Sequence, residues 1–252
     1  MDYWFAPSQV IPLDAFAIMT LPVSSLQVYS WRLSELDPVF PFAALPLIIE
    51  VGAVKDHSRD ADASWLHVAQ LLERGWAIEG VSIDEPHVAS IDASVPFDAA
   101  IAATKRFIQR CRTANLKVGL IEYVHPNSPY RVRDVLAFAS ALHEPLDWLH
   151  LDIDKNVEIR PGRRKNWADV RRLVEEAVQY TSVLHEWPVG VIAWPGGASQ
   201  DYERDTREAV HQLAAMPIHR IIVQSWETDD TDLASQLRRL PRVEANQMEV
   251  TT

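Results

Sequence analysis

The sequence predicts an α/β protein folded as a (β/α)8 barrel. From about residue 45 onward, short β-branched runs alternate with longer amphipathic stretches, which gives six strand-helix units in series. Such a series implies parallel strands joined by right-handed helical crossovers. Two earlier apolar runs, at 14–22 and 25–33, bring the number of strands to eight in 252 residues, the usual size of such a barrel. A doubly wound open sheet is the alternative fold.

The predicted elements follow one another in a regular order. The two earlier runs leave no room for a full helix between them, so we expect an abbreviated or irregular N-terminal part. The six later strands are at 45–53, 77–85, 117–125, 146–154, 189–197 and 219–227, and their helices are at 63–76, 97–114, 130–143, 166–187, 201–216 and 232–240. We expect one domain over residues 1–252, with a frayed tail at 242–252.

Composition and charge limit the environment and the partners. The chain has a single cysteine, Cys111, no secretory signal at its N-terminus and no apolar run of the ~20 residues that a membrane span needs. We therefore expect a cytoplasmic protein that does not enter a membrane. The net charge is −11 and the basic residues are scattered except at 160–165, which argues against nucleic acid as a partner.

Acidic side chains recur where successive predicted strands end. Because side chains alternate between the two faces of a strand, each run can be divided into an outward apolar set and an inward polar set. This division predicts that four acids point toward the barrel axis near its C-terminal end: Glu50, Asp84, Glu122 and Asp152. The active sites of such barrels lie at that end, and clustered like charges are costly unless they are used.

Paired carboxylates fit glycoside hydrolysis, in which one protonates the leaving oxygen and the other attacks or activates water. The ending SIDEP of the fourth strand resembles the strand-four ending of the retaining glycosidase superfamily of (β/α)8 barrels, where Asn-Glu-Pro carries the acid/base glutamate. The resemblance implies that Glu85 is the acid/base residue and that Trp226, after the eighth strand, seats a sugar ring. The chain departs from the family in having Asp84 for Asn and Trp194 where the strand-seven nucleophile is expected.

The second carboxylate of such a pair is then Glu122 or Asp152, with Asp84 beside them, and no cofactor is expected. The strand ends also supply the predicted substrate-binding residues, which are Glu50, His87, Tyr123, His125, His150, Asp154, Trp194, Gln224 and Trp226. Tryptophan near a strand end offers a flat surface on which a pyranose ring stacks. The predicted partner is therefore a carbohydrate substrate.

Two alternatives stay open. The same strand ends place Glu50, Asp84-x-x-His87, Glu122-x-x-His125 and His150-x-Asp152-x-Asp154 in series, a mixture of ligands that suits one divalent metal ion. This pattern is similar to the xylose-isomerase-like barrels and implies a metal-dependent sugar isomerase, epimerase or metallohydrolase. The other alternative is a barrel that binds carbohydrate without cleaving it, which the missing strand-seven glutamate would allow.

Overall fold

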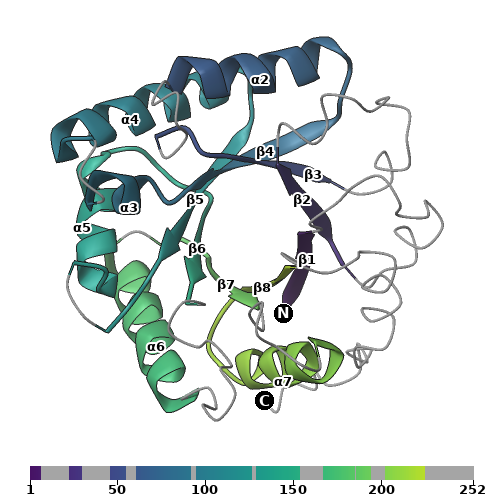
Figure 1. Cartoon of the computed structure of the whole chain (residues 1–252), viewed down its shortest axis with the longest axis vertical. Coiled ribbons are helices and arrows are strands. Elements are labelled where there is room, and N and C mark those ends of the chain that lie inside the picture. Colours follow the sequence, from purple (N-terminus) through teal and green to yellow (C-terminus); the bar gives the residue numbers. More distant parts are fainter. Residues whose placement is uncertain are drawn as a thin grey trace, which may run out of the picture.

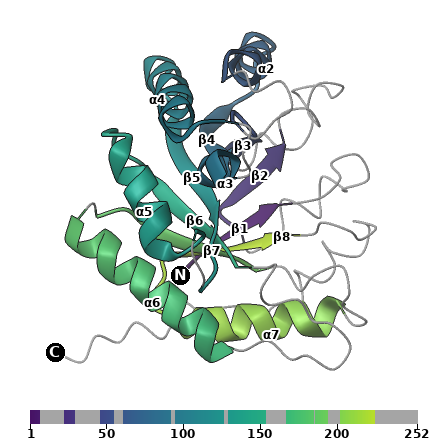
Figure 2. The same ribbon diagram turned by 60° about the vertical axis from the view of Figure 1, so that its left-hand side comes forward.

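The computed structural model shows a closed barrel of eight parallel strands in the order β1 to β8. It describes residues 1–6, 23–29, 46–54, 61–91, 95–126, 129–153, 167–184, 186–193 and 202–224. Figure 1 looks into the ring of strands, with the helices outside it, and Figure 2 shows α5 and α6 on its outer side. The predicted (β/α)8 barrel is confirmed, and the pairing of β1 with β8 closes the sheet and rules out the open alternative.

The elements alternate along the chain as the periodicity predicts. The strands are β1 (Asp2–Ala6), β2 (Ser25–Tyr29), β3 (Leu47–Val51), β4 (Ile78–Asp84), β5 (Lys117–Tyr123), β6 (Trp148–Asp152), β7 (Val189–Ala193) and β8 (Arg220–Gln224). The helices are α2 (Ala61–Glu73), α3 (Pro86–Ile91), α4 (Phe97–Thr113), α5 (Val132–Ala141), α6 (Trp167–Leu184) and α7 (Tyr202–Ala214). None of these helices has the length and apolar character that a membrane crossing requires.

The first strand differs from the prediction. The barrel begins with Asp2–Ala6, which pairs along its whole length with β8 and also pairs with β2. The predicted first strand at 14–22 was therefore wrong, and those residues and the expected tail at 242–252 lie outside the described residues. The three aromatic residues of DYWFA favour a strand, but the run is short and does not alternate between apolar and polar residues, so the pattern does not mark it.

The strands separate two apolar layers. Their outer faces pack under the helices, through residues such as Phe5, Ile49, Ile83 and Leu120. The inner faces form a smaller cluster inside the barrel, made of Trp4, Ala6, Ile48, Ile121, Trp148, Ile192 and Ile222. Because side chains alternate along a strand, this inner cluster identifies which other residues face the axis.

Three glycines make room for bulky rings inside the barrel. A Cβ atom on Gly119 would overlap the indole of Trp148, and one on Gly80 would lie 2.8 Å from Cη2 of the same ring. A Cβ atom on Gly190 would lie 2.7 Å from Cδ2 of His150. These strand glycines are therefore required by close packing, since the interior of an eight-stranded barrel is only wide enough for its side chains.

Candidate functional site

Three of the four predicted acids face the axis at the C-terminal end of the barrel. Glu50 follows Ile48 on the inner face of β3, and Asp152 follows Trp148 on the inner face of β6. Asp84 pairs in register with Ile121, whose side chain belongs to the inner cluster. These carboxylates come from β3, β4 and β6, so the mouth of the barrel is acidic on several sides.

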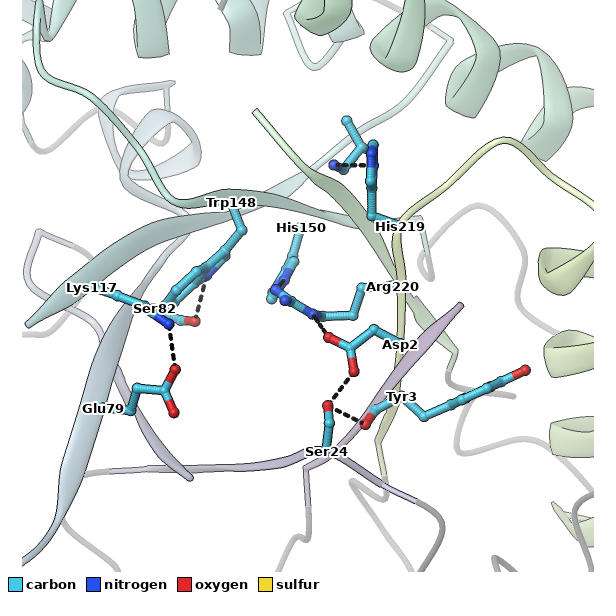
Figure 3. A network of polar contacts seen from close by, with 11 residues as sticks. Asp2, Tyr3, Ser24, Glu79, Ser82, Lys117, Trp148, His150, His219 and Arg220 are labelled. Carbon is cyan, nitrogen blue, oxygen red and sulfur yellow. Dashed lines mark hydrogen bonds and ion pairs between the residues drawn. The ribbon is translucent and has the colours of Figure 1, made fainter. Parts of the chain in front are cut away.

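A chain of buried hydrogen bonds holds Glu50 in place. The Trp148 Nε1–H donates to Ser82 Oγ at 3.1 Å, as Figure 3 shows, and the Ser82 hydroxyl donates to Gln27 Oε1 at 3.1 Å. Gln27 Nε2 then donates to Glu50 Oε2 at 2.7 Å. The chain crosses the interior from β6 through β4 and β2 to β3. It fixes one carboxylate oxygen of Glu50, and Glu50 is only 3% exposed.

Aromatic rings line the mouth beside Asp152. Tyr123 is the inward residue that ends β5, and it pairs in register with Asp152. Its ring lies edge-on to Tyr130, with centroids 5.4 Å apart, and 6.4 Å from the ring of His125. The backbone joins the same residues, because His125 N–H donates to the Tyr130 carbonyl at 2.7 Å. Tyr123, His125 and Tyr130 thus form an aromatic group next to a carboxylate.

Glu85 has an unusual backbone conformation at the end of β4. Its φ is 46°, in the left-handed region that costs a non-glycine residue about 1–3 kcal/mol. The other non-glycine residues of this kind in the described ranges, Asn115, His143 and Glu186, all follow the last turn of a helix, where this conformation is common. Glu85 instead joins a strand to a helix, and it is only 3% exposed. Strain of this kind at a strand end of a barrel is typical of functional sites.

Glu122 does not face the axis, and this prediction was wrong. Ile121 takes the inner face of β5, so Glu122 points outward, where it is fully buried and its Oε1 accepts the backbone N–H of His87 at 2.8 Å. Its Oε2 has no hydrogen-bond partner among the described residues. Burial raises the pKa of Glu122 well above its usual value, and the nearby Glu85 and Asp84 raise it further. Apolar residues occupy both faces of KVGLIEY, so the alternation of this strand is ambiguous.

His87 was predicted to be a loop residue at the mouth. This prediction was wrong, because His87 packs between helices. It lies in α3, is only 5% exposed, and its Nε2 lies 3.1 Å from the Pro129 carbonyl oxygen. Its ring packs against Phe138 of α5 at a centroid distance of 5.5 Å. Burial lowers the pKa of His87. This histidine therefore belongs to the packing around α3.

His150 lies inside the barrel, below the mouth. Its ring stacks on Trp148 at 5.9 Å, meets Trp4 edge-on at 5.0 Å, and is completely buried. Arg220 Nη1 lies 3.3 Å from its Nε2, as Figure 3 shows. Burial lowers the pKa of His150 well below its usual value, and the positive charge of Arg220 lowers it further. The predicted contact of His150 with substrate is not supported by this position.

The cluster around Arg220 was not predicted. The guanidinium of Arg220, at the start of β8, lies 3.7 Å above the Trp4 ring, and its Nε donates to Asp2 Oδ2 at 2.8 Å. Asp2 also accepts a hydrogen bond from the Ser24 hydroxyl. Asp2, Ser24 and Arg220 lie at the starts of β1, β2 and β8, which is the N-terminal end of the barrel, and Figure 3 shows them together. Half of the cluster lies on β1, the strand that the sequence pattern missed.

The remaining predicted residues are divided. Gln224 is the inward residue that ends β8 and is 6% exposed, whereas Asp154, Trp194 and Trp226 lie outside the described residues. In the described part of the chain, no three histidine, cysteine, aspartate or glutamate residues lie close enough together to hold a metal ion. The series of acid-histidine pairs is dispersed, because Glu122 and His87 lie behind the barrel wall and His150 lies deep inside it.

Comparisons with known proteins show a likeness of fold. No protein-family model matches the chain, and no curated protein matches it. Among solved structures, a GH128 endo-β-1,3-glucanase from Sorangium cellulosum has 11% sequence identity and a TM-score of 0.57, over 94% of this chain and 98% of that one. A glucosidase from Croceicoccus marinus has 16% identity and a TM-score of 0.52, over 91% of this chain and 61% of that one.

Barrels of other chemistry are equally similar. The HMG-CoA lyase of Bacillus subtilis has 11% identity and a TM-score of 0.55, over 89% of this chain and 76% of that one. At these identities a likeness establishes the fold alone, because one barrel fold supports many chemistries. The chain is therefore a (β/α)8 barrel with distant similarity to glycoside-hydrolase-like barrels among others.

Proposed function

We propose that this protein is a glycoside hydrolase-like enzyme that acts on a carbohydrate through carboxylates at the C-terminal mouth of its barrel. The observation that carries the proposal is Glu85, a buried acid in a strained conformation at the end of β4. This is also the residue that the SIDEP resemblance matches to an acid/base glutamate. The fold likeness to a glucanase and a glucosidase is consistent with this chemistry.

The proposal assigns a chemical role to each of six residues. Glu85 protonates the leaving oxygen, and Asp152, which faces the axis, is the second carboxylate that attacks the sugar or activates water. Tyr123 and Tyr130 beside Asp152 provide aromatic surface for a sugar ring. Glu50 and Gln224, on inner faces of β3 and β8, accept or donate hydrogen bonds to hydroxyl groups.

Other mechanisms have less support in the described residues. Cys111 is buried in α4, and burial raises the pKa of its thiol to about 12, so it is a poor nucleophile. The metal-dependent isomerase alternative relied on a series of acid-histidine pairs that does not gather at the mouth. The proposal therefore uses no cofactor, and it predicts that activity persists in EDTA.

The test begins with a screen of aryl glycosides and a β-1,3-glucan, with and without EDTA. Glu85→Gln is then compared with Glu79→Gln, a matched control at the opposite end of the same strand, where Glu79 pairs with Lys117. Loss of general acid catalysis costs about 10²- to 10⁴-fold in rate, so we expect this loss in Glu85→Gln only. Full activity in Glu85→Gln, or activity that disappears with EDTA, would overturn the proposal.

A further inference from the structure

Strand β5 accepts two hydrogen bonds from the chain at and just after Glu85. The backbone N–H of Glu85 donates to the Ile121 carbonyl at 2.8 Å, and two residues later the N–H of His87 donates to Glu122 Oε1 at 2.8 Å. The Glu85 carbonyl itself accepts the Ala89 N–H at 3.0 Å, the first turn of α3. Two consecutive residues of β5, Ile121 and Glu122, thus accept hydrogen bonds from Glu85 and His87, which fixes the left-handed conformation of Glu85.

The bond to Glu122 satisfies a backbone group that a helix cannot satisfy alone. The first N–H groups of a helix have no partner within it, and a side-chain oxygen can accept a hydrogen bond from one of them. At the start of α4 the residue at the N-cap position, Pro96, supplies no such side-chain hydrogen bond. Glu122 therefore anchors the start of α3, the helix that immediately follows Glu85.

Glu122 cannot itself meet a substrate. Its side chain lies on the outer face of β5 and is completely buried, behind the barrel wall. The negative charges of Glu85 and Asp84 at the end of β4 are near enough to raise its pKa, and the backbone amides of His87 and Val88 in α3 lie beside it. Any influence on catalysis must therefore act through its neighbours.

We infer that Glu122 is a positioning residue, which holds α3 to β5 and so keeps Glu85 in the conformation that its chemistry requires. The inference rests on the proposed function for its effect on catalysis. The anchoring of α3 by Glu122 is a structural statement that can be tested without any substrate.

The test compares Glu122→Met, which removes the acceptor at similar size, with Glu122→Gln, which keeps an acceptor oxygen. The control is Asp147→Met, because Asp147 Oδ2 accepts a hydrogen bond from the backbone N–H of Val118 in β5 at 2.7 Å. Amide hydrogen exchange by NMR reports the anchor directly. In the wild type we expect the His87 amide to be at least tenfold more protected than the Asp98 amide in the uncapped first turn of α4.

In Glu122→Met the protection of the His87 amide should fall at least tenfold, whereas Glu122→Gln and Asp147→Met should keep it. On a glycoside that the wild type cleaves, Glu122→Met should lower kcat at least tenfold with KM within twofold, and Glu122→Gln should keep most of the wild-type kcat.

If Glu122→Met does not fold, the comparison of the two amides in the wild type and the measurements on Glu122→Gln still test the inference. An unprotected His87 amide in the wild type, or unchanged protection in Glu122→Met, would overturn the inference. If no glycoside is cleaved, the proposed function fails while the exchange data still judge the anchor.

Discussion

The close approach of the Trp148 ring to Gly119 gives a prediction about a single methyl group. In Gly119→Ala, the new Cβ would overlap the ring of Trp148, which is 2% exposed. The ring has little freedom to move, because Trp4 lies edge-on to it at 5.2 Å and His150 is stacked on it at 5.9 Å. We expect the substitution to force the indole out of its position.

The cost has two parts. Forcing an extra group into a packed core costs about 1–3 kcal/mol. Displacement of the indole also breaks its hydrogen bond to Ser82 Oγ, and a buried polar group left without a partner costs a further ~1–3 kcal/mol. The sum predicts that Gly119→Ala lowers the free energy of unfolding by about 2–6 kcal/mol.

A double-mutant cycle with Trp148→Ala tests the stated cause. Unfolding by urea, followed by tryptophan fluorescence, gives the free energies of the wild type, the two single variants and the double variant. Because the clash is absent once the indole is removed, Gly119→Ala should cost less than about 1 kcal/mol in the Trp148→Ala background, which means a strong coupling. Equal costs of Gly119→Ala in the two backgrounds would refute the packing argument.

Three further predictions concern buried polar groups. The folded pKa of Glu122 is raised, so wild-type stability should fall relative to Glu122→Gln by up to ~1.4 kcal/mol per pH unit above about pH 4.5; a constant difference in urea unfolding would contradict this. The folded pKa of His150 is depressed, so its contribution to the free energy of unfolding is present above about pH 6.5 and is lost on acidification. His150→Phe should flatten this loss of stability at low pH, and an unchanged dependence of stability on pH would contradict the prediction. Ser82→Ala leaves Trp148 Nε1 and Gln27 Oε1 without a partner, and it should lower the free energy of unfolding by about 1–3 kcal/mol for each. An unchanged melting temperature would disprove the hydrogen-bond chain.

Local patterns were sufficient to predict the barrel and the inward orientation of Glu50, Asp84 and Asp152. Asp84 alternates with the outward apolar residues Val81 and Ile83, and Asp152 with Leu149 and Leu151, so alternation assigns the faces of both acids. Alternation failed for Glu122, because Leu120 and Ile121 are both apolar and only packing against Trp148 and Ile48 selects Ile121 for the interior.

Other features depend on contacts between distant parts of the chain. The ring of Trp148 fits only because Gly80 and Gly119, on two other strands, lack a side chain. Asp2 becomes meaningful only when β1 closes on β8 and brings it to Arg220. Such contacts form through the closure of the barrel, and no local periodicity reports them. The same limit applies to Glu122, whose partner His87 is recognisable only after α3 packs on β5.

The most direct test of the central claim, that Glu85 protonates a leaving oxygen, is the dependence of kcat/KM on the leaving group. Wild type and Glu85→Gln are compared on aryl glycosides whose phenols range from weakly to strongly acidic. A proton donor matters only when the leaving group is a poor one, so Glu85→Gln should lose about 10²-fold or more with a weakly acidic phenol and approach wild type with a dinitrophenol. The same loss with every leaving group, or no loss with any, would contradict the role assigned to Glu85.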